Sequence, residues 1–157
     1  MSKNSDKKTQ YMEEIHAMRD KREDNCIFCK ILDGEIPSRK VYEDDSFVGI
    51  LDVSPAARGH VIIIPKSHAA NVFELPDEDA QKIFAVAKRV AIAIDKAYHP
   101  DGINILQNNG EAAGQSVFHL HVHVIPRYNE DSVNIKWDQL EMDDLDQVMN
   151  EIKQEMR

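Results

Sequence analysis

The chain has 157 residues, a formal net charge of −9 and only two cysteines. This length fits one domain with its own core and leaves little room for a second. The negative charge opposes extended binding to DNA, RNA or anionic lipid, and the sequence has neither a long apolar run nor an apolar signal segment near its start. We therefore expect a cytoplasmic protein that binds neither nucleic acid nor membrane.

The first 24 residues form a highly charged extension. Apolar residues recur in it at helical spacing, which indicates either a helix lying on the domain or a disordered arm; they are Tyr11, Ile15 and Met18. The composition becomes more apolar from Cys26, so we place the start of the domain at residue 25 and expect the domain to run to residue 157.

A hairpin and a central strand are predicted next. Residues 40–42 and 47–52 are expected to pair around a polar turn. Residues 61–64 are all β-branched, which is typical of a strand covered on both faces, and Pro65 should stop it. We expect this strand to be the central one.

The second half begins with the clearest helix, over 77–98, where one apolar stripe runs between charged positions. A strand follows over 103–107, and a loop of small and polar residues over 108–116 leads into the next strand. A polar tail begins at about residue 128. It should end in a short helix whose apolar residues pack on the domain; they are Leu145, Val148, Met149 and Ile152.

This order of elements favours an α+β domain. Strands come first, one long helix follows, and strands return. Such an order suits an antiparallel sheet with its helices on one side.

Three histidines alternate with apolar residues over 118–126, the two-residue period of a strand. Side chains on one face of a strand lie about 7 Å apart, so His119, His121 and His123 should form a row of imidazoles. One imidazole could attack phosphorus while its neighbours orient it and protonate the leaving group. Alternatively, the row holds a catalytic metal. A solvated strand face without function is the third reading.

The two cysteines, Cys26 and Cys29, form a Cys-x-x-Cys pair. A thioredoxin-like motif should lie in a βαβ unit, and none is predicted around this pair. A closed zinc site fits better, with two further ligands from elsewhere. His68 and His119 are the best candidates, and a buried, inert pair is the alternative.

The segment His119–Ile125 resembles the signature of the histidine triad (HIT) superfamily of nucleotide hydrolases and transferases, most closely its bacterial Hint-type branch with a zinc site. The likeness covers about residues 25–127. Its other motifs are Cys26–Ile31, Ile36-Pro37, Tyr42–Asp44, Leu51–Pro55, Gly59–Lys66 and Gly114–Val117. The resemblance implies an α+β fold in which two protomers join their sheets into a homodimer, with a purine nucleotide pocket in each.

The resemblance also implies a division of labour. His121 would attack the α-phosphorus of an adenylated substrate and form a nucleotidyl-imidazole that water resolves. His123 would contact the phosphate and the leaving group. Gln115 and Ser116, with the loop at Gly114, would donate to the phosphate oxygens.

Further roles are carried over from the resemblance in the same way. Asp52 would hold the ribose hydroxyls, and Asn108 would lie near the phosphate. The base would sit among apolar residues, namely Ile27, Phe28, Ile50 and Val53.

The resemblance also implies a structural zinc ion. It further implies that His60 lies behind the three histidines and contacts them without touching the substrate. Zinc would take a cysteine pair, the first triad histidine and the histidine after the third strand; these are Cys26, Cys29, His119 and His68.

The leading functional hypothesis is therefore a hydrolase of nucleoside phosphoramidates, such as AMP joined to an amine. The ending Val124–Arg127 resembles the fragile-histidine-triad branch equally well, so dinucleotide polyphosphates are the alternative substrates. A nucleotide-binding or scaffold protein with little turnover is the rival from another class.

Overall fold

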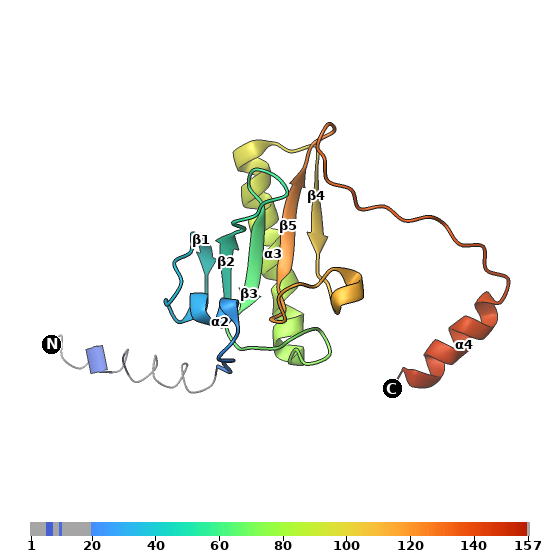
Figure 1. The fold of residues 1–157 in the computed structure, drawn as a ribbon, viewed down its shortest axis with the longest axis horizontal. Helices are drawn as coiled ribbons and strands as arrows, with labels where there is room; N and C mark the ends of the chain where they lie inside the picture. Colours follow the sequence, from blue (N-terminus) through green and yellow to red (C-terminus); the bar gives the residue numbers. More distant parts are fainter. Residues whose placement is uncertain (1–5, 8–9, 11–19, 157) are drawn as a thin grey trace.

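The computed structural model describes residues 6–7, 10 and 20–156. Its centre is one antiparallel five-stranded sheet in the order β1-β2-β3-β5-β4 (Figure 1). The strands are β1 Lys40–Glu43, β2 Phe47–Leu51, β3 Val61–Pro65, β4 Gly102–Leu106 and β5 Val122–Arg127. The predicted hairpin is confirmed in β1 and β2, and β3 is the central strand.

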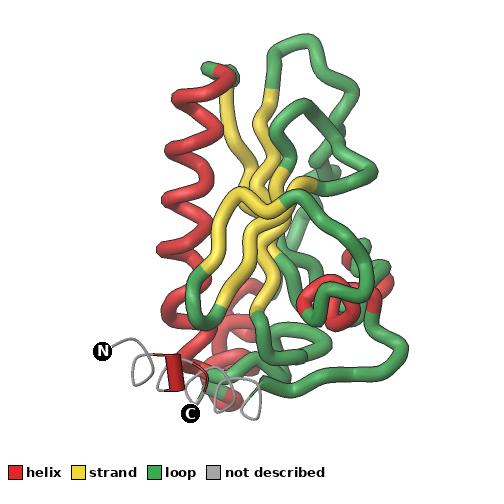
Figure 2. Tube along the Cα trace, turned by 90° about the vertical axis from the view of Figure 1, so that its left-hand side faces the viewer, coloured by secondary structure: helices red, strands yellow, loops and turns green. Residues whose placement is uncertain are grey.

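The helices lie on both sides of this sheet. Helix α3, Asp77–Tyr98, has the predicted bounds and runs along one face (Figure 2). The short helix α2, Ile27–Leu32, packs against the opposite face, where Phe28 joins Ile62 and Ile64 in a buried cluster. The α+β fold is confirmed, but the expectation of helices on one side only is wrong. A 3₁₀ turn at Glu111–Ala113 and helix α4, Leu145–Glu155, complete the elements.

Alternation along β3 divides the core into two layers. Val61 and Ile63 pack with α3, while Ile62 and Ile64 pack with α2. All five residues of β3 are buried. Since successive side chains on a strand point to opposite faces, a run of β-branched residues suits a strand that is covered on both sides.

The predicted histidine strand begins later than expected. Strand β5 starts at Val122, so only His123 of the three histidines lies on it. Its ladder with β3 covers Val122–Val124. Before that point the chain leaves the ladder, and the amide of Leu120 donates to the carbonyl of Ala69 instead. The expected row of equivalent histidines on one strand is therefore wrong.

The C-terminal helix is also placed differently from the prediction. Helix α4 lies away from the sheet at the end of an extended segment (Figure 1). It has no buried residue, and three of its apolar side chains are exposed, so packing on the domain is not observed; they are Leu145, Met149 and Ile152.

Two expectations concern the chain beyond this core. Tyr11, Ile15 and Met18 of the predicted N-terminal helix lie outside the described residues. No helix in the described part of the chain is long and apolar enough to span a membrane.

Candidate functional site

The sheet register places the site on the face that α2 covers. His123 of β5 is the partner of Ile62 on β3, and paired residues on neighbouring strands point to the same face. Ile62 packs with Phe28 of α2. The imidazole of His123 therefore points to the α2 side, away from α3.

His121 is held by a backbone carbonyl. Its Nδ1 lies 2.8 Å from the carbonyl oxygen of His119. A carbonyl only accepts, so Nδ1 carries the proton and Nε2 keeps a free lone pair in the neutral ring. Burial lowers the pKa of His121 below its usual value, which favours this neutral form. The rings of Phe28 and His121 form a T-shaped pair with 5.0 Å between their centroids.

His123 is held in the opposite tautomer by His60. The amide of Ala56 donates to His60 Nδ1 at 3.0 Å, so neutral His60 carries its proton on Nε2. That Nε2–H lies 2.8 Å from His123 Nδ1, which must accept. Burial is the largest cause that lowers the pKa of His123 to about 4, and the charges of His121 and His60 act in the same direction. Neutral His123 therefore presents a protonated Nε2.

Asp52 stands beside these two rings. Its Oδ2 is 3.5 Å from His60 Nε2 and 4.0 Å from His123 Nδ1. Its Oδ1 accepts from the amide of Ser54 at 2.8 Å. Burial lowers the pKa of His60, and the Asp52 charge opposes that change. Asp52, His60 and His123 are close enough together to bind a metal ion. The 2.8 Å contact between the rings of His60 and His123, however, has the geometry of an ordinary hydrogen bond.

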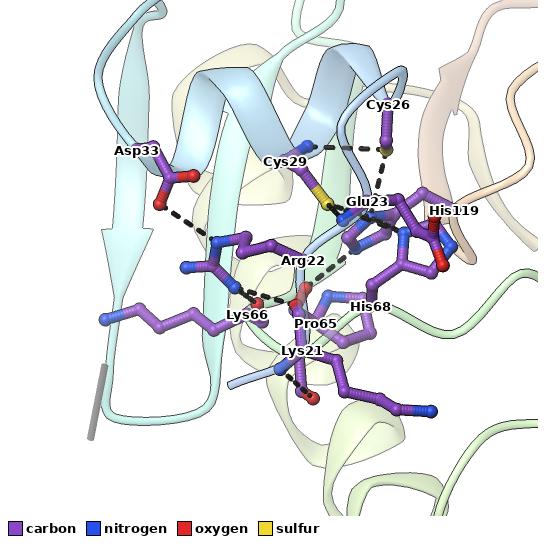
Figure 3. Close-up of polar contacts among 11 residues, drawn as sticks. Lys21, Arg22, Glu23, Cys26, Cys29, Asp33, Pro65, Lys66, His68 and His119 are labelled. Carbon is purple, nitrogen blue, oxygen red and sulfur yellow. Dashed lines mark hydrogen bonds and ion pairs between the residues drawn. The ribbon is translucent and has the colours of Figure 1, made fainter. Parts of the chain in front are cut away.

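A second cluster joins the two cysteines to two histidines (Figure 3). Cys26 lies at the N-cap of α2 and Cys29 in its first turn, so both sulfurs lie on one side of the helix. His119 Nδ1 lies 3.4 Å from the sulfur of Cys26 and 3.6 Å from that of Cys29. His68 Nδ1 lies 3.5 Å from Cys29 and 3.1 Å from His119 Nδ1.

The donor atoms of this cluster fit a tetrahedral metal site. Ligands at ordinary zinc distances around one ion stand roughly 3.3–3.8 Å apart, close to the separations observed. His119 Nε2 donates to the carbonyl of Pro65 at 2.9 Å, so its Nδ1 is the unprotonated nitrogen and faces the cluster. Burial lowers the pKa of His119 to about 4 and keeps it neutral.

The loop before the histidines holds its own shape through Gln115. This buried side chain accepts from the amide of Gly110 at 2.8 Å and donates to the carbonyls of Ala70 and Val117 at 2.6 and 3.1 Å. Both amide hydrogens are used, so the predicted donation of Gln115 to a phosphate has no free donor in this arrangement. Ser116, the next residue, is exposed.

The residues predicted to hold a base are unequally placed. Phe28 and Ile50 are buried in one cluster, while Ile27 is 47% and Val53 85% exposed. The structure therefore brings the first two together and leaves the other two open to solvent. Asn108 lies against the loop, because a Cβ built on Gly114 would meet its side-chain nitrogen at 3.4 Å.

A cavity of about 490 Å³ adjoins the cysteine cluster. Its walls include predicted residues from three parts of the chain, namely Ile27, His68 and Ser116. Glu23 and Asn25 also line it. The chain before the predicted start of the domain thus contributes to this region.

Sequence reasoning missed the carbonyls that fix the tautomers and the contacts of Arg22. The carbonyls belong to His119 and Pro65, and no side-chain pattern identifies a backbone acceptor. Arg22 bonds to residues 11 and 44 positions away in the sequence. In the sequence, the only indication of a role for Arg22 is the high charge of the N-terminal extension.

The model of the HIT domain matches residues 33–130 of this chain. The chain belongs to the HIT family.

Two curated relatives of this HIT protein span most of its length. "Protein hit" of Bacillus subtilis (strain 168) is 52% identical over 107 residues, covering 68% of this chain and 74% of that protein. "Adenosine 5'-monophosphoramidase hnt1" of Schizosaccharomyces pombe is 43% identical over 114 residues, covering 72% of this chain and 83% of that one.

A solved structure also resembles this HIT protein. It is described as a Zn-bound histidine triad family protein from Mycobacterium smegmatis. The two chains are 43% identical with a TM-score of 0.67, covering 74% of this chain and 84% of that one.

The hydrogen bonds of the site predict opposite tautomers for neighbouring histidines. At neutral pH, ¹⁵N spectra of the labelled full chain should show His121 protonated at Nδ1, and His123 at Nε2. In His60→Ala, which removes the donor to His123, the signals of His123 should move to a mixture of tautomers while those of His121 stay unchanged. A wild-type His121 protonated at Nε2 would contradict this assignment.

Proposed function

We propose that this protein is a nucleotidyl hydrolase or transferase that cleaves adenylated substrates at the α-phosphate through a covalent intermediate on His121. One observation carries the proposal: His121 presents a bare Nε2 and its neighbour His123 presents a protonated one. The two rings lie 4.8 Å apart between centroids. A nucleophile and a proton donor thus stand side by side without an acidic residue in either role.

The chemistry of the first step uses these two nitrogens. The lone pair of His121 Nε2 forms a bond to the α-phosphorus, and the bond from phosphorus to the leaving group breaks. The departing amine takes the proton of His123 Nε2, and the ring takes up one proton from solvent, so His123 is neutral before and after the step. The Asp52 charge favours the imidazolium form through which this transfer passes. Water then attacks phosphorus and gives one proton back to solvent, the bond to His121 breaks, and AMP leaves.

The substrate class we propose is a nucleoside phosphoramidate. The fission yeast relative is named an adenosine 5'-monophosphoramidase. The feature that favoured dinucleotide polyphosphates was Arg127, which ends β5, about 20 Å of strand from His121. Its guanidinium is bonded to Asp131, Asn104 and the carbonyl of Val133. The guanidinium of Arg127 is thus already hydrogen-bonded within the protein and is not directed at a polyphosphate.

The nucleotide would lie across the α2 face of the sheet. We propose that Asp52 holds the ribose hydroxyls and that Phe28 and Ile50 contact the base, with Ile27 and Val53 closing over it from their exposed positions. Ser116 and backbone amides at Gly114 would donate to the phosphate, and Asn108 would support them. Gln115 would position that loop through its own hydrogen bonds.

We propose that the four-residue cluster is a structural zinc site. Cys26, Cys29, His68 and His119 supply two sulfurs and two nitrogens at separations that suit tetrahedral coordination, and a relative with this fold is described as Zn-bound. Bound zinc would supply a fixed charge and geometry. Held there, the backbone of His119 keeps its carbonyl directed at His121.

We propose a homodimer built on strand β4. In the described part of the chain, β4 pairs only with β5 and is an edge of the sheet. Phe84 on α3 is 65% exposed. A second copy joined at this edge would pair the free backbone groups and cover such apolar surface. The cytoplasmic location stays a prediction.

Replacing the nucleophile tests the reaction. His121→Ala should lose at least about 10³-fold in turnover of an AMP phosphoramidate, because no other imidazole presents a lone pair to phosphorus, while AMP binding persists. Intact-mass measurement after a rapid quench should find one added adenylyl group on the wild type and none on the variant. His99→Ala, at the far end of α3, is the control and should keep full activity.

Two results would oppose this proposal. Unchanged turnover in His121→Ala would exclude the nucleophile. AMP binding by the wild type without turnover or adduct would instead favour a nucleotide-binding scaffold. A side-by-side rate comparison with a dinucleotide polyphosphate tests the substrate class, and we expect the phosphoramidate to be faster.

Metal analysis tests the zinc site. Protein purified without chelator should carry close to one zinc per chain, and Cys29→Ser should carry much less because a thiolate ligand is lost. Burial raises the pKa of the Cys29 thiol to about 11, so zinc uptake should release protons that a pH indicator detects. Zinc-free wild type would leave the cysteines as packing residues.

Sedimentation tests the dimer. The full chain of 17.9 kDa should sediment as a particle of twice this mass. Ile103→Pro removes an amide from β4 and should shift the equilibrium toward monomer. A wild-type protein that is monomeric at high micromolar concentration refutes the proposed assembly.

A further inference from the structure

Three residues before the predicted domain start contact the cysteine–histidine cluster. Lys21, Arg22 and Glu23 lie beside it with their backbone and side chains bonded to the elements that carry its ligands (Figure 3). These elements are separate: the cysteines come from α2, and His68 from the loop after β3. Contacts between α2 and the loop that carries His68 are therefore needed to keep the cysteine sulfurs and the His68 nitrogen close enough to bind one ion.

The backbone of this segment contacts both halves of the ligand set. The amide of Glu23 donates to the sulfur of Cys29 at 3.4 Å. The carbonyl of Lys21 accepts from the amide of His68 at 2.9 Å. The amide of Lys21 donates to the hydroxyl of Ser67 at 2.9 Å. One short stretch of chain thus bonds to a ligand from each element.

Arg22 joins the same two elements through its side chain. Its Nε donates to the carboxylate of Asp33, the C-cap residue of α2, at 2.9 Å. Its Nη1 donates to the carbonyl of Lys66, two residues before His68, and to that of Lys21. The rigid fork of a guanidinium suits this bridge, because one planar group serves acceptors from both sides.

These contacts add little to the global stability of the fold. The side chains of Arg22 and Asp33 are 28% and 46% exposed, and partly exposed ion pairs contribute little. Their effect should be local. Partners that orient metal ligands typically change metal affinity 10- to 100-fold when they are removed.

We propose that Arg22 is a positioning residue for the metal site, clamping α2 to the loop that carries His68 so that the four ligands are held at coordination distance before the ion arrives. The inference rests on the proposed zinc site. It gives the last residues of the charged extension a specific role, because they close the site from outside. Zinc binding and the contacts of residues 21–23 with the domain are then linked, so weakening either one weakens the other.

Chelator competition on the full chain measures this effect. We expect Arg22→Ala to bind zinc about tenfold more weakly than the wild type. Asp33→Ala should lose less, because the bond from Arg22 to the Lys66 carbonyl remains. The matched control is Lys82→Ala, which removes an exposed ion pair within α3 and should bind zinc like the wild type. Circular dichroism of each variant checks that it is folded.

Trypsin provides a second readout that does not depend on activity. With the Lys21 carbonyl and amide both bonded, cleavage after Lys21 in the zinc-loaded wild type should be slow. It should be several-fold faster in zinc-loaded Arg22→Ala, and unchanged in Lys82→Ala. Mass spectrometry identifies the cleaved bond.

The possible results separate this inference from the zinc site itself. If the wild type binds no zinc, the metal site and the inference both fail. If the wild type binds zinc and Arg22→Ala binds it within twofold, the zinc site stands and the inference is wrong. Faster cleavage without weaker zinc binding would mean that Arg22 only anchors the extension, which also overturns it. Should Arg22→Ala not fold, unchanged zinc affinity in Asp33→Ala would overturn the inference instead.

Discussion

The hydrogen bond from His121 Nδ1–H to the carbonyl of His119 connects the two parts of the site. Through its ring, His119 belongs to the cysteine cluster, and through its backbone it directs the neighbouring imidazole. Its ring is fixed in turn by the Pro65 carbonyl at the end of β3. One buried residue therefore transmits the geometry of the cluster to the proposed nucleophile, with no side chain between them.

Burial explains why this acidic chain holds neutral imidazoles at the proposed site. Burial lowers the pKa of His121 and His123, so both rings stay uncharged at neutral pH and differ only in which nitrogen holds the proton. Their partners make that choice, a carbonyl for one and His60 for the other. In the proposed reaction, these neutral rings of opposite tautomer would serve as the nucleophile and the hydrogen-bond donor.

Segments remote in sequence hold this arrangement in place. Gln115 uses its amide on the backbone of its own loop and of Ala70, while Arg22 reaches across to α2 and to the end of β3. Such contacts leave no apolar pattern. Gln115 ties the loop before the histidines to the carbonyls of Ala70 and Val117. Arg22 ties the chain before α2 to the carbonyl of Lys66 and to the carboxylate of Asp33.

Periodicity alone predicted β3, the bounds of α3 and the α+β class, because burial of alternating or helical stripes is a local property. The Cys-x-x-Cys spacing indicated two metal ligands, and the resemblance to the HIT superfamily implied the set of four residues that the structure brings together. Only the tertiary structure decided that β5 begins at Val122, that α2 covers the other face, and that α4 has no buried residue. It also decided the tautomers of His121 and His123. Those depend on backbone carbonyls and ring partners brought near by folding, which no side-chain pattern encodes.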